Sequence, residues 1–247
     1  NIEDLKFYQN PSDPTVQRSW NRGSADDAFP LYWDNPYWWA YERPQNDQRD
    51  RMFGNAGVTL KLNSWLSLQG RAMTDFYTEV REEKIAVGSV DISKYSKDIY
   101  TLSENNYDLM LRANKQLSNK FSIEAFVGGN RLDRKLRRNF NSTQGGLGTP
   151  GFYNLSNSIS ALAVTDFTER KRINSVFGSV SLGFNNMLYV DLTGRNDWSS
   201  TLPADNNSYF YPSVAGSFIL SELFSENLAK SLSFAKIRAS WAQVGND

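Results

Sequence analysis

The side chains that most often carry out catalysis are scarce in this sequence of 247 residues. It contains no histidine and no cysteine, so the commonest general base, the commonest metal ligand and the thiolate nucleophile are all missing. Carboxylates do occur in adjacent pairs, such as Asp26 with Asp27 and Glu82 with Glu83. Paired carboxylates can perform acid–base work, but adjacent side chains of a strand face opposite ways. The sequence therefore predicts no catalytic residue, no metal site, no cofactor and no enzyme.

One basic cluster could bind an anion, whereas the overall charge and a glycine-rich run give no such signal. The sequence carries 27 Lys+Arg and 27 Asp+Glu, so charge gives no case for nucleic acid. The glycine-rich run at 145–151 lacks the Gly-Lys-Ser/Thr that completes a phosphate-binding loop. A basic cluster could contact lipopolysaccharide phosphates or an acidic ligand, although such clusters are more often simply hydrated. Its members are Arg131, Arg134, Lys135, Arg137 and Arg138.

A dense group of aromatic residues near the N-terminus is the strongest candidate for binding. Residues 1–51 are expected to form an irregular loop, because prolines interrupt any regular element. Aromatic rings stack on sugars and peptides and anchor partner proteins, but they equally pack a long loop onto itself. On the first interpretation, we predict that four of them contact a ligand or a lid protein: Trp33, Tyr37, Trp38 and Trp39.

The elements that must position these residues are β-strands. In residues 173–195, Val176, Val180 and Leu182 alternate with small polar residues, and the alternation resumes after residues 185–187. A period of two indicates a strand, because successive side chains point to opposite faces. The interruption of three residues predicts a tight hairpin turn that keeps both apolar faces on one side.

Four such hairpins are predicted, the last of them looser: 52–77, 106–130, 173–195 and 209–244. Short turns lie at one end of the strands, whereas long polar loops are expected at the other end, over 78–105 and 131–171. Outer-membrane barrels segregate short periplasmic turns from long extracellular loops in this way, and about 9–11 residues suffice for a strand to cross the hydrocarbon. The predicted fold is an all-β, antiparallel transmembrane β-barrel segment of about eight strands, with residues 1–51 as an extracellular loop.

Several short segments resemble the barrel portion of TonB-dependent outer-membrane transporters of the SusC/RagA type. Singly they are weak signals, but their order and intervals from residue 35 to the end are specific. They are 35–38 (NPYW), 49–55 (RDRMFGN), 194–200 (GRNDWSS), 211–214 (YPSV), 221–224 (SELF) and 236–246 (KIRASWAQVGN).

The resemblance implies active import of oligosaccharides or oligopeptides by a multi-pass protein of the bacterial outer membrane. It also implies a SusD-like surface lipoprotein as a lid, energy supplied through TonB, and a surrounding lipid bilayer. Transporters of this kind use about 22 strands. Eight strands would therefore be an internal fragment of the barrel, without the plug domain that would contact TonB and without the C-terminal strands.

Two alternatives stay open from the sequence. One is a small, self-contained eight-stranded barrel acting as an adhesin or structural protein. The other is a soluble carbohydrate-binding β-sandwich or glycosidase. The membrane interpretation requires the apolar face of the hairpins to meet lipid, and it would fail if four residues on that face were buried together in a protein interior. These are Leu60, Leu111, Val180 and Phe218.

Overall fold

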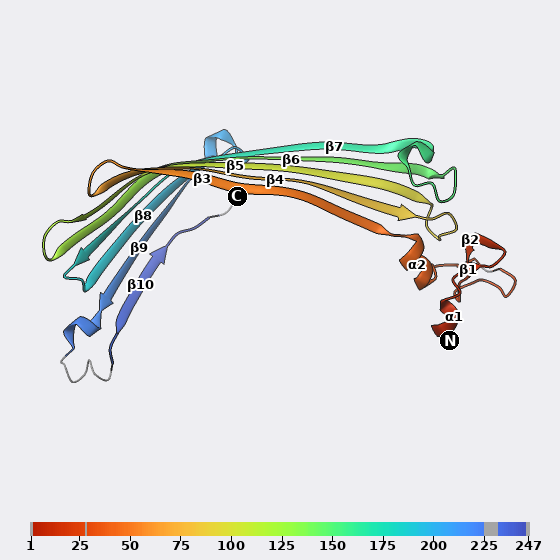
Figure 1. The fold of residues 1–247 in the computed structure, drawn as a ribbon, viewed down its shortest axis with the longest axis horizontal. Coiled ribbons are helices and arrows are strands. Elements are labelled where there is room, and N and C mark those ends of the chain that lie inside the picture. Colours follow the sequence, from red (N-terminus) through yellow and green to blue (C-terminus); the bar gives the residue numbers. More distant parts are fainter. Residues whose placement is uncertain (1, 28, 225–231, 246–247) are drawn as a thin grey trace. The chain divides into compact units, whose positions relative to one another are not determined.

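One eight-stranded antiparallel sheet dominates the computed structural model, which describes residues 2–27, 29–224 and 232–245. The strands lie side by side in the order β10-β9-β8-β7-β6-β5-β4-β3, so each one is paired with its neighbours in sequence (Figure 1). The predicted all-β antiparallel fold is thereby confirmed. The strands are β3 (Gln45–Lys61), β4 (Leu66–Ile85), β5 (Lys94–Gln116), β6 (Phe121–Leu147), β7 (Ser158–Phe184), β8 (Leu188–Ser199), β9 (Ser208–Ile219) and β10 (Lys236–Ala242).

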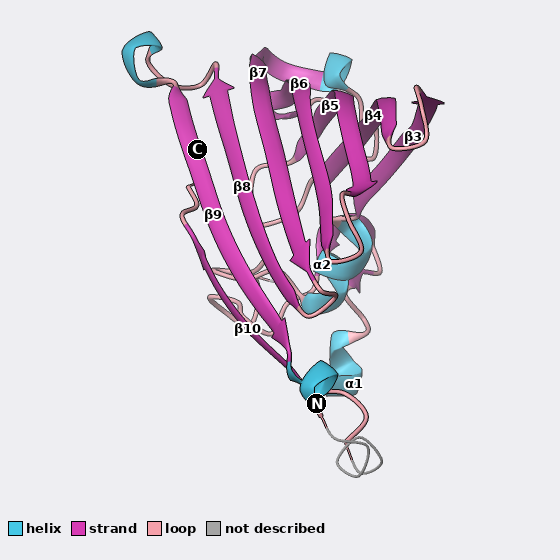
Figure 2. Cartoon of the chain, turned by 90° about the vertical axis from the view of Figure 1, so that its left-hand side faces the viewer, coloured by secondary structure: helices cyan, strands magenta, loops and turns pink. Residues whose placement is uncertain are grey.

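The remaining elements are short, and Figure 2 shows the helices in cyan beside the magenta strands. None of the helices among the described residues has the length and apolar character needed to cross a membrane. The prediction of an irregular loop over 1–51 is wrong in part, because this region contains two helices and a small hairpin, and β3 already begins at Gln45. The short elements are α1 (Ile2–Leu5), β1 (Gln9–Asn10), β2 (Asp13–Gln17), α2 (Pro36–Glu42), η1 (Leu155–Asn157), η2 (Ala204–Asn206) and η3 (Leu220–Leu223).

The strands run further than the sequence pattern predicts. The long loops expected over 78–105 and 131–171 are wrong, since only 86–93 and 148–157 lie between the strands there. Apolar alternation is weaker in these extensions because polar and charged side chains interrupt it. Ion pairs between neighbouring strands replace it, such as Lys94 with Glu83 at 2.7 Å and Arg138 with Asp98 at 2.8 Å.

The tight turns lie where the alternation predicts them. Phe184 pairs with Leu188 across the turn between β7 and β8, and the amide of Met187 donates to the carbonyl of Phe184 at 3.0 Å. Asn185 and Asn186 both have positive φ, at 54° and 55°, a conformation that asparagine tolerates better than most residues. The fourth predicted turn includes residues 225–231, which lie outside the described part of the chain.

The chain divides into two compact units, which we describe separately. Unit 1 comprises residues 1–52, 76–102 and 136–169, and unit 2 comprises 53–75, 103–135 and 170–247. Among the described residues, the buried hydrophobic side chains all belong to unit 1: Trp38, Ile85, Ala86, Tyr95, Leu102 and Leu147. Unit 1 therefore has a small protein core of its own.

Unit 2 leaves one face of its sheet apolar and uncovered. Among the four residues named above, Leu60 is 54% exposed, and Leu111, Val180 and Phe218 are partly exposed. None of the four is buried in a protein interior, as the membrane interpretation requires. Other exposed apolar side chains of unit 2 are Leu62, Leu109, Leu117, Phe121, Val127, Val176, Leu182, Leu188, Leu192, Val214 and Ile237.

Candidate functional site

The N-terminal aromatic residues are held on a defined scaffold, which we call the aromatic lobe (residues 2–27 and 29–44). Helix α2 begins at Pro36, a residue well suited to the first helical turn, and Asn35 caps it by accepting from the amide of Tyr37 at 2.9 Å. The amide group of Asn35 also donates to the carbonyls of Leu5 at 3.0 Å and Arg18 at 2.8 Å. One buried asparagine thus fixes both the start of α2 and the preceding chain.

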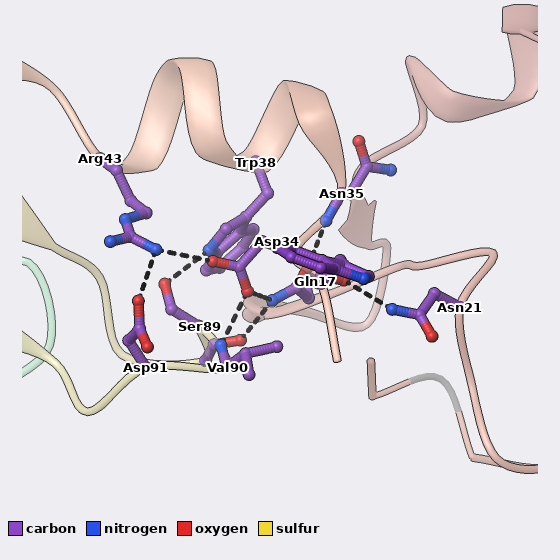
Figure 3. Close-up of polar contacts among 11 residues, drawn as sticks. Gln17, Asn21, Asp34, Asn35, Trp38, Arg43, Ser89, Val90 and Asp91 are labelled. Carbon is purple, nitrogen blue, oxygen red and sulfur yellow. Dashed lines mark hydrogen bonds and ion pairs between the residues drawn. The ribbon is translucent and has the colours of Figure 1, made fainter. Parts of the chain in front are cut away.

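Buried polar contacts attach the aromatic lobe to the connection between β4 and β5 (Figure 3). Gln17, which is fully buried, donates from Nε2 to Asp34 Oδ1 at 2.7 Å and to the carbonyl of Gly88 at 2.8 Å. Its Oε1 accepts from the amide of Asn35 at 2.8 Å. Asp34 accepts in turn from the amide of Val90 at 2.7 Å. These bonds satisfy groups that would otherwise be costly to bury.

Trp38 belongs to this anchor. Its side chain is 1% exposed, and its indole N–H donates to Ser89 Oγ at 2.9 Å. The ring of Tyr8 packs edge-on against it, with centroids 6.3 Å apart. In this arrangement Trp38 is enclosed by protein, so we assign it to the packing of the aromatic lobe and keep the predicted ligand or lid contact for the other three residues.

The remaining predicted residues are accessible. Trp33 is 72% exposed and Trp39 is 53% exposed, while Tyr37 is partly exposed and stacks with Tyr41 at 6.3 Å between ring centroids. The Arg43 guanidinium lies 3.8 Å over the Trp39 ring, a cation–π arrangement that orients the indole. Such exposed rings on a fixed scaffold can stack on a sugar, a peptide or a partner protein.

Sequence reasoning missed two contributors to this site. Tyr8 stacks on Tyr41 with ring centroids 5.6 Å apart, and Arg43 also pairs with Asp34 at 3.3 Å and Asp91 at 2.9 Å. The contacts of Tyr8 with Tyr41 and of Arg43 with Asp91 join residues that are distant in the chain, so no local pattern predicts them.

A charged network on β3, β4 and β5 lies in unit 1. Glu79 is almost fully buried and accepts from Arg49 Nε at 2.7 Å and also from Arg81. Burial would raise the pKa of the Glu79 carboxyl, but the two guanidinium groups outweigh it and hold that pKa below its usual range. The guanidinium of Arg81 lies 5.0 Å from the Tyr100 ring.

A second perturbed group of unit 1 is the Tyr95 hydroxyl on β5. Burial, and then a hydrogen bond to Glu82, raises the pKa of Tyr95 to about 12.

Unit 2 carries a similar network on the face opposite its apolar one. Arg71 Nε donates to Asp108 at 3.0 Å, and Asn130 donates to the same carboxyl at 2.5 Å. Arg112 lies 5.5 Å from the Phe126 ring. No group of three or more acidic, histidine or cysteine side chains that could hold a metal ion occurs among the residues described. The arrangement is a polar surface that suits contact with water.

This chain is similar to known proteins both in sequence and in fold, although no family model matches the sequence. The chain is 34% identical over 98 residues to TonB-dependent receptor P26 of Formosa agariphila, a match that covers 39% of this chain and 10% of that protein.

The fold of this chain is similar to part of the RagAB peptide importer. In the closed-closed state the TM-score is 0.78 at 19% identity, covering 96% of this chain and 27% of that one. In the open-open state the TM-score is 0.75 at 17% identity, covering 94% and 26%. The chain therefore spans about a quarter of the length of these solved chains.

The two-faced antiparallel sheet has the fold of part of the RagAB importer, over about a quarter of that chain. More particularly, the comparisons confirm the resemblance predicted from the motifs, to TonB-dependent receptors of the SusC/RagA type.

Proposed function

We propose that this chain forms part of the wall of a TonB-dependent transporter that imports oligopeptides or oligosaccharides across the outer membrane. One observation carries the proposal: the sheet of unit 2 exposes apolar side chains on one face and arginine–carboxylate pairs on the other. Lipid tails on the first face and a water-filled passage on the second account for both. The tight turns would then lie on the periplasmic side and the strand extensions outside the cell.

Oligopeptides are the substrate class that we favour. The polar face presents both signs of charge, through pairs such as Arg71 with Asp108 and Arg195 with Asp197. A peptide backbone with mixed side chains finds partners on such a surface, and the similar RagAB structures are described as those of a peptide importer. Oligosaccharides remain the second candidate, because exposed aromatic rings stack on sugars as well.

The proposed partners follow from the same arrangement. A SusD-like surface lipoprotein would close over the outer end of the passage and contact Trp33, Tyr37 and Trp39. Energy would reach the substrate through TonB acting on a plug domain. The support for the lid is the exposure of these rings on a scaffold fixed by Gln17 and Asn35.

The two alternatives are less well supported. A self-contained eight-stranded barrel requires its first and last strands to pair, whereas β3 and β10 are the two edges of the described sheet. A soluble sandwich requires a second sheet over the apolar face, and the second sheet in the described residues is the small β1-β2 pair. That pair lies in unit 1, whereas the exposed apolar face lies in unit 2.

Uptake by the intact receptor tests the transport function. Cells that carry the complete protein should accumulate labelled oligopeptides, and the uptake should disappear when TonB is removed. Equal uptake with and without TonB would contradict energised transport. Parallel assays with labelled oligosaccharides decide between the two substrate classes.

Substitution tests the aromatic contact separately. We expect a combined Trp33→Ala, Tyr37→Ala and Trp39→Ala variant to weaken substrate or lid binding by about tenfold or more, as buried aromatic anchors do. Trp20→Ala is the matched control, because Trp20 is also exposed, at 67%, and lies in the same lobe. Unchanged affinity for both substrate and lipoprotein in the triple variant would remove these residues from the proposed site.

A further inference from the structure

Four basic side chains stand on the apolar face of unit 2, at the end away from the tight turns. We call them the outer basic patch: Arg131, Lys135, Arg170 and Arg172. On β6 the odd-numbered residues include the exposed Val127, and on β7 the even-numbered ones include the exposed Val176. Because side chains alternate along a strand, each basic residue shares the face of these valines.

The basic cluster seen in the sequence is thus divided between the two faces. Arg134 and Arg138 have the opposite parity and pair with carboxylates of β5, Arg134 with Glu104 at 4.0 Å and Arg138 with Asp98 at 2.8 Å. Arg131 and Lys135 point to the apolar side, where β7 adds Arg170 and Arg172. The structure therefore assembles a patch that the linear sequence does not show.

Contacts bring the members of the patch together across β6 and β7. Arg131 Nε donates to Asp133 at 2.7 Å, and Arg172 Nε donates to the other oxygen of that carboxyl at 2.5 Å. A depression of about 610 Å³ lies beside them. It is lined by Asp133, Lys135, Arg170 and Arg172, by the polar Ser103 and Asn105, and also by Arg134, Lys171 and Ser200. Four basic side chains and one carboxylate leave three positive charges in excess. Both arginines of the Asp133 pair remain about half exposed, at 49% and 53%.

The position of the patch matches the edge of a lipid layer. Two aromatic residues of the apolar face, Tyr107 and Trp198, are exposed, and Trp198 pairs with Asn174, one alternate position from Arg172. Exposed aromatic rings mark the interface between hydrocarbon and head groups. From Leu182 to Arg172 the strand rises about 34 Å, which at a tilt of about 45° is about 24 Å of depth, close to the apolar band of outer-membrane barrels.

We propose that the outer basic patch binds the phosphate groups of a lipid A-type glycolipid in the outer leaflet. The inference rests on the proposed function, because it requires the apolar face to meet lipid. Arginine pairs with phosphate through two parallel N–H bonds, and lysine adds a point charge. The hydroxyl of Ser103 and the amide of Asn105 supply further polar groups in the same depression. The excess positive charge complements an anionic head group, whereas a neutral one would gain nothing from it.

Lipid binding by the complete, detergent-purified receptor tests the proposal. The probes are bisphosphorylated lipid A and its dephosphorylated form, and native mass spectrometry reports the bound fraction. Lys135→Gln with Arg170→Gln should weaken binding of bisphosphorylated lipid A about thirtyfold, at roughly fivefold for each basic side chain near an anionic membrane surface. These two positions leave the Asp133 pair with Arg131 and Arg172 intact.

Two further variants keep the result interpretable. Lys115→Gln with Lys120→Gln removes the same charge from exposed residues near the tight-turn end and should leave the affinity unchanged. Lys135→Arg with Arg170→Lys preserves charge and should bind nearly as well as the wild type, which separates loss of the site from misfolding.

Different outcomes would contradict the basic patch, its glycolipid ligand and the proposed function. Equal binding of both lipids by the wild type, or equal affinity in wild type and the glutamine variant, would refute the patch while leaving transport untouched. Competition by inorganic phosphate at millimolar concentration would show a general anion site and refute the glycolipid. Absence of lipid binding by every variant, together with absence of TonB-dependent uptake, would refute the membrane-spanning wall itself.

Discussion

Replacing Trp38 is the most direct test of how the aromatic lobe is held. The side chain is 1% exposed and forms one hydrogen bond, to Ser89. A tryptophan buries about 200 Å², which at about 25 cal/mol per Å² is about 5 kcal/mol. Measured Trp→Ala costs in cores are about 3–5 kcal/mol. We therefore expect Trp38→Ala to lower the free energy of opening of the aromatic lobe by about 3–5 kcal/mol.

Amide hydrogen exchange on the intact receptor measures this loss. Peptides covering 9–27 and 86–93 should exchange about a hundred- to a few thousandfold faster, since about 1.4 kcal/mol corresponds to tenfold. Ser89→Ala keeps the ring and should cost only about 1 kcal/mol, and Trp33→Ala, at an exposed position, should stay within about 0.5 kcal/mol. If Trp38→Ala left exchange unchanged but weakened substrate or lid binding, the reasoning that makes it a packing residue would be refuted.

Three further predictions concern the backbone, the buried carboxylate and the lipid face. Gly88→Ala should lower the free energy of opening of the aromatic lobe by at least about 1 kcal/mol more than Gly151→Ala does. Both glycines have positive φ, but of the two only Gly88 would place a methyl group against the backbone of the aromatic lobe. Glu79→Gln should destabilise unit 1 by about 1–3 kcal/mol. Because the folded-state pKa of Glu79 lies below its ordinary value of 4.5, its contribution is present above that pH and is lost as the pH falls through the folded-state pKa. Acid titration of exchange rates should show this loss in the wild type, and the same loss in the glutamine variant would contradict it. Val176→Arg, near the middle of the apolar band, should cost about 2–4 kcal/mol of folding in lipid vesicles, whereas Ser179→Arg on the polar face should be tolerated. Heat-modifiability on gels measures both, and equal effects would argue against a lipid-facing Val176.

The sequence predicts the half of the fold that carries the tight turns well. Strict alternation around Val180 and Leu192 fixes the two faces, and the structure pairs these residues directly. The upper strands could not be predicted in the same way. Polar and charged side chains interrupt the period of two in these strand extensions, and pairs such as Arg138 with Asp98 form only after the strands align.

The candidate site was predictable only in outline. The aromatic content of residues 29–41 identifies the region, but neighbouring residues of a helix point about 100° apart. Trp38 and Trp39 consequently have opposite roles, one enclosed and one exposed. Their assignment depends on Ser89, which is 51 residues away from Trp38 in the chain, and short-range patterns carry no information about such a contact.

The great length of the central strands has a consequence for resistance to proteases. β6 and β7 have 27 residues each, a contour of about 90 Å at about 3.3–3.4 Å per residue, far more than a bilayer requires. Proteases grip a substrate by adding it as an extra strand, and a backbone already bonded on both sides leaves them nothing to hold. A sheet of such long, fully paired strands can thus resist proteolysis without a disulfide, in a chain that has no cysteine.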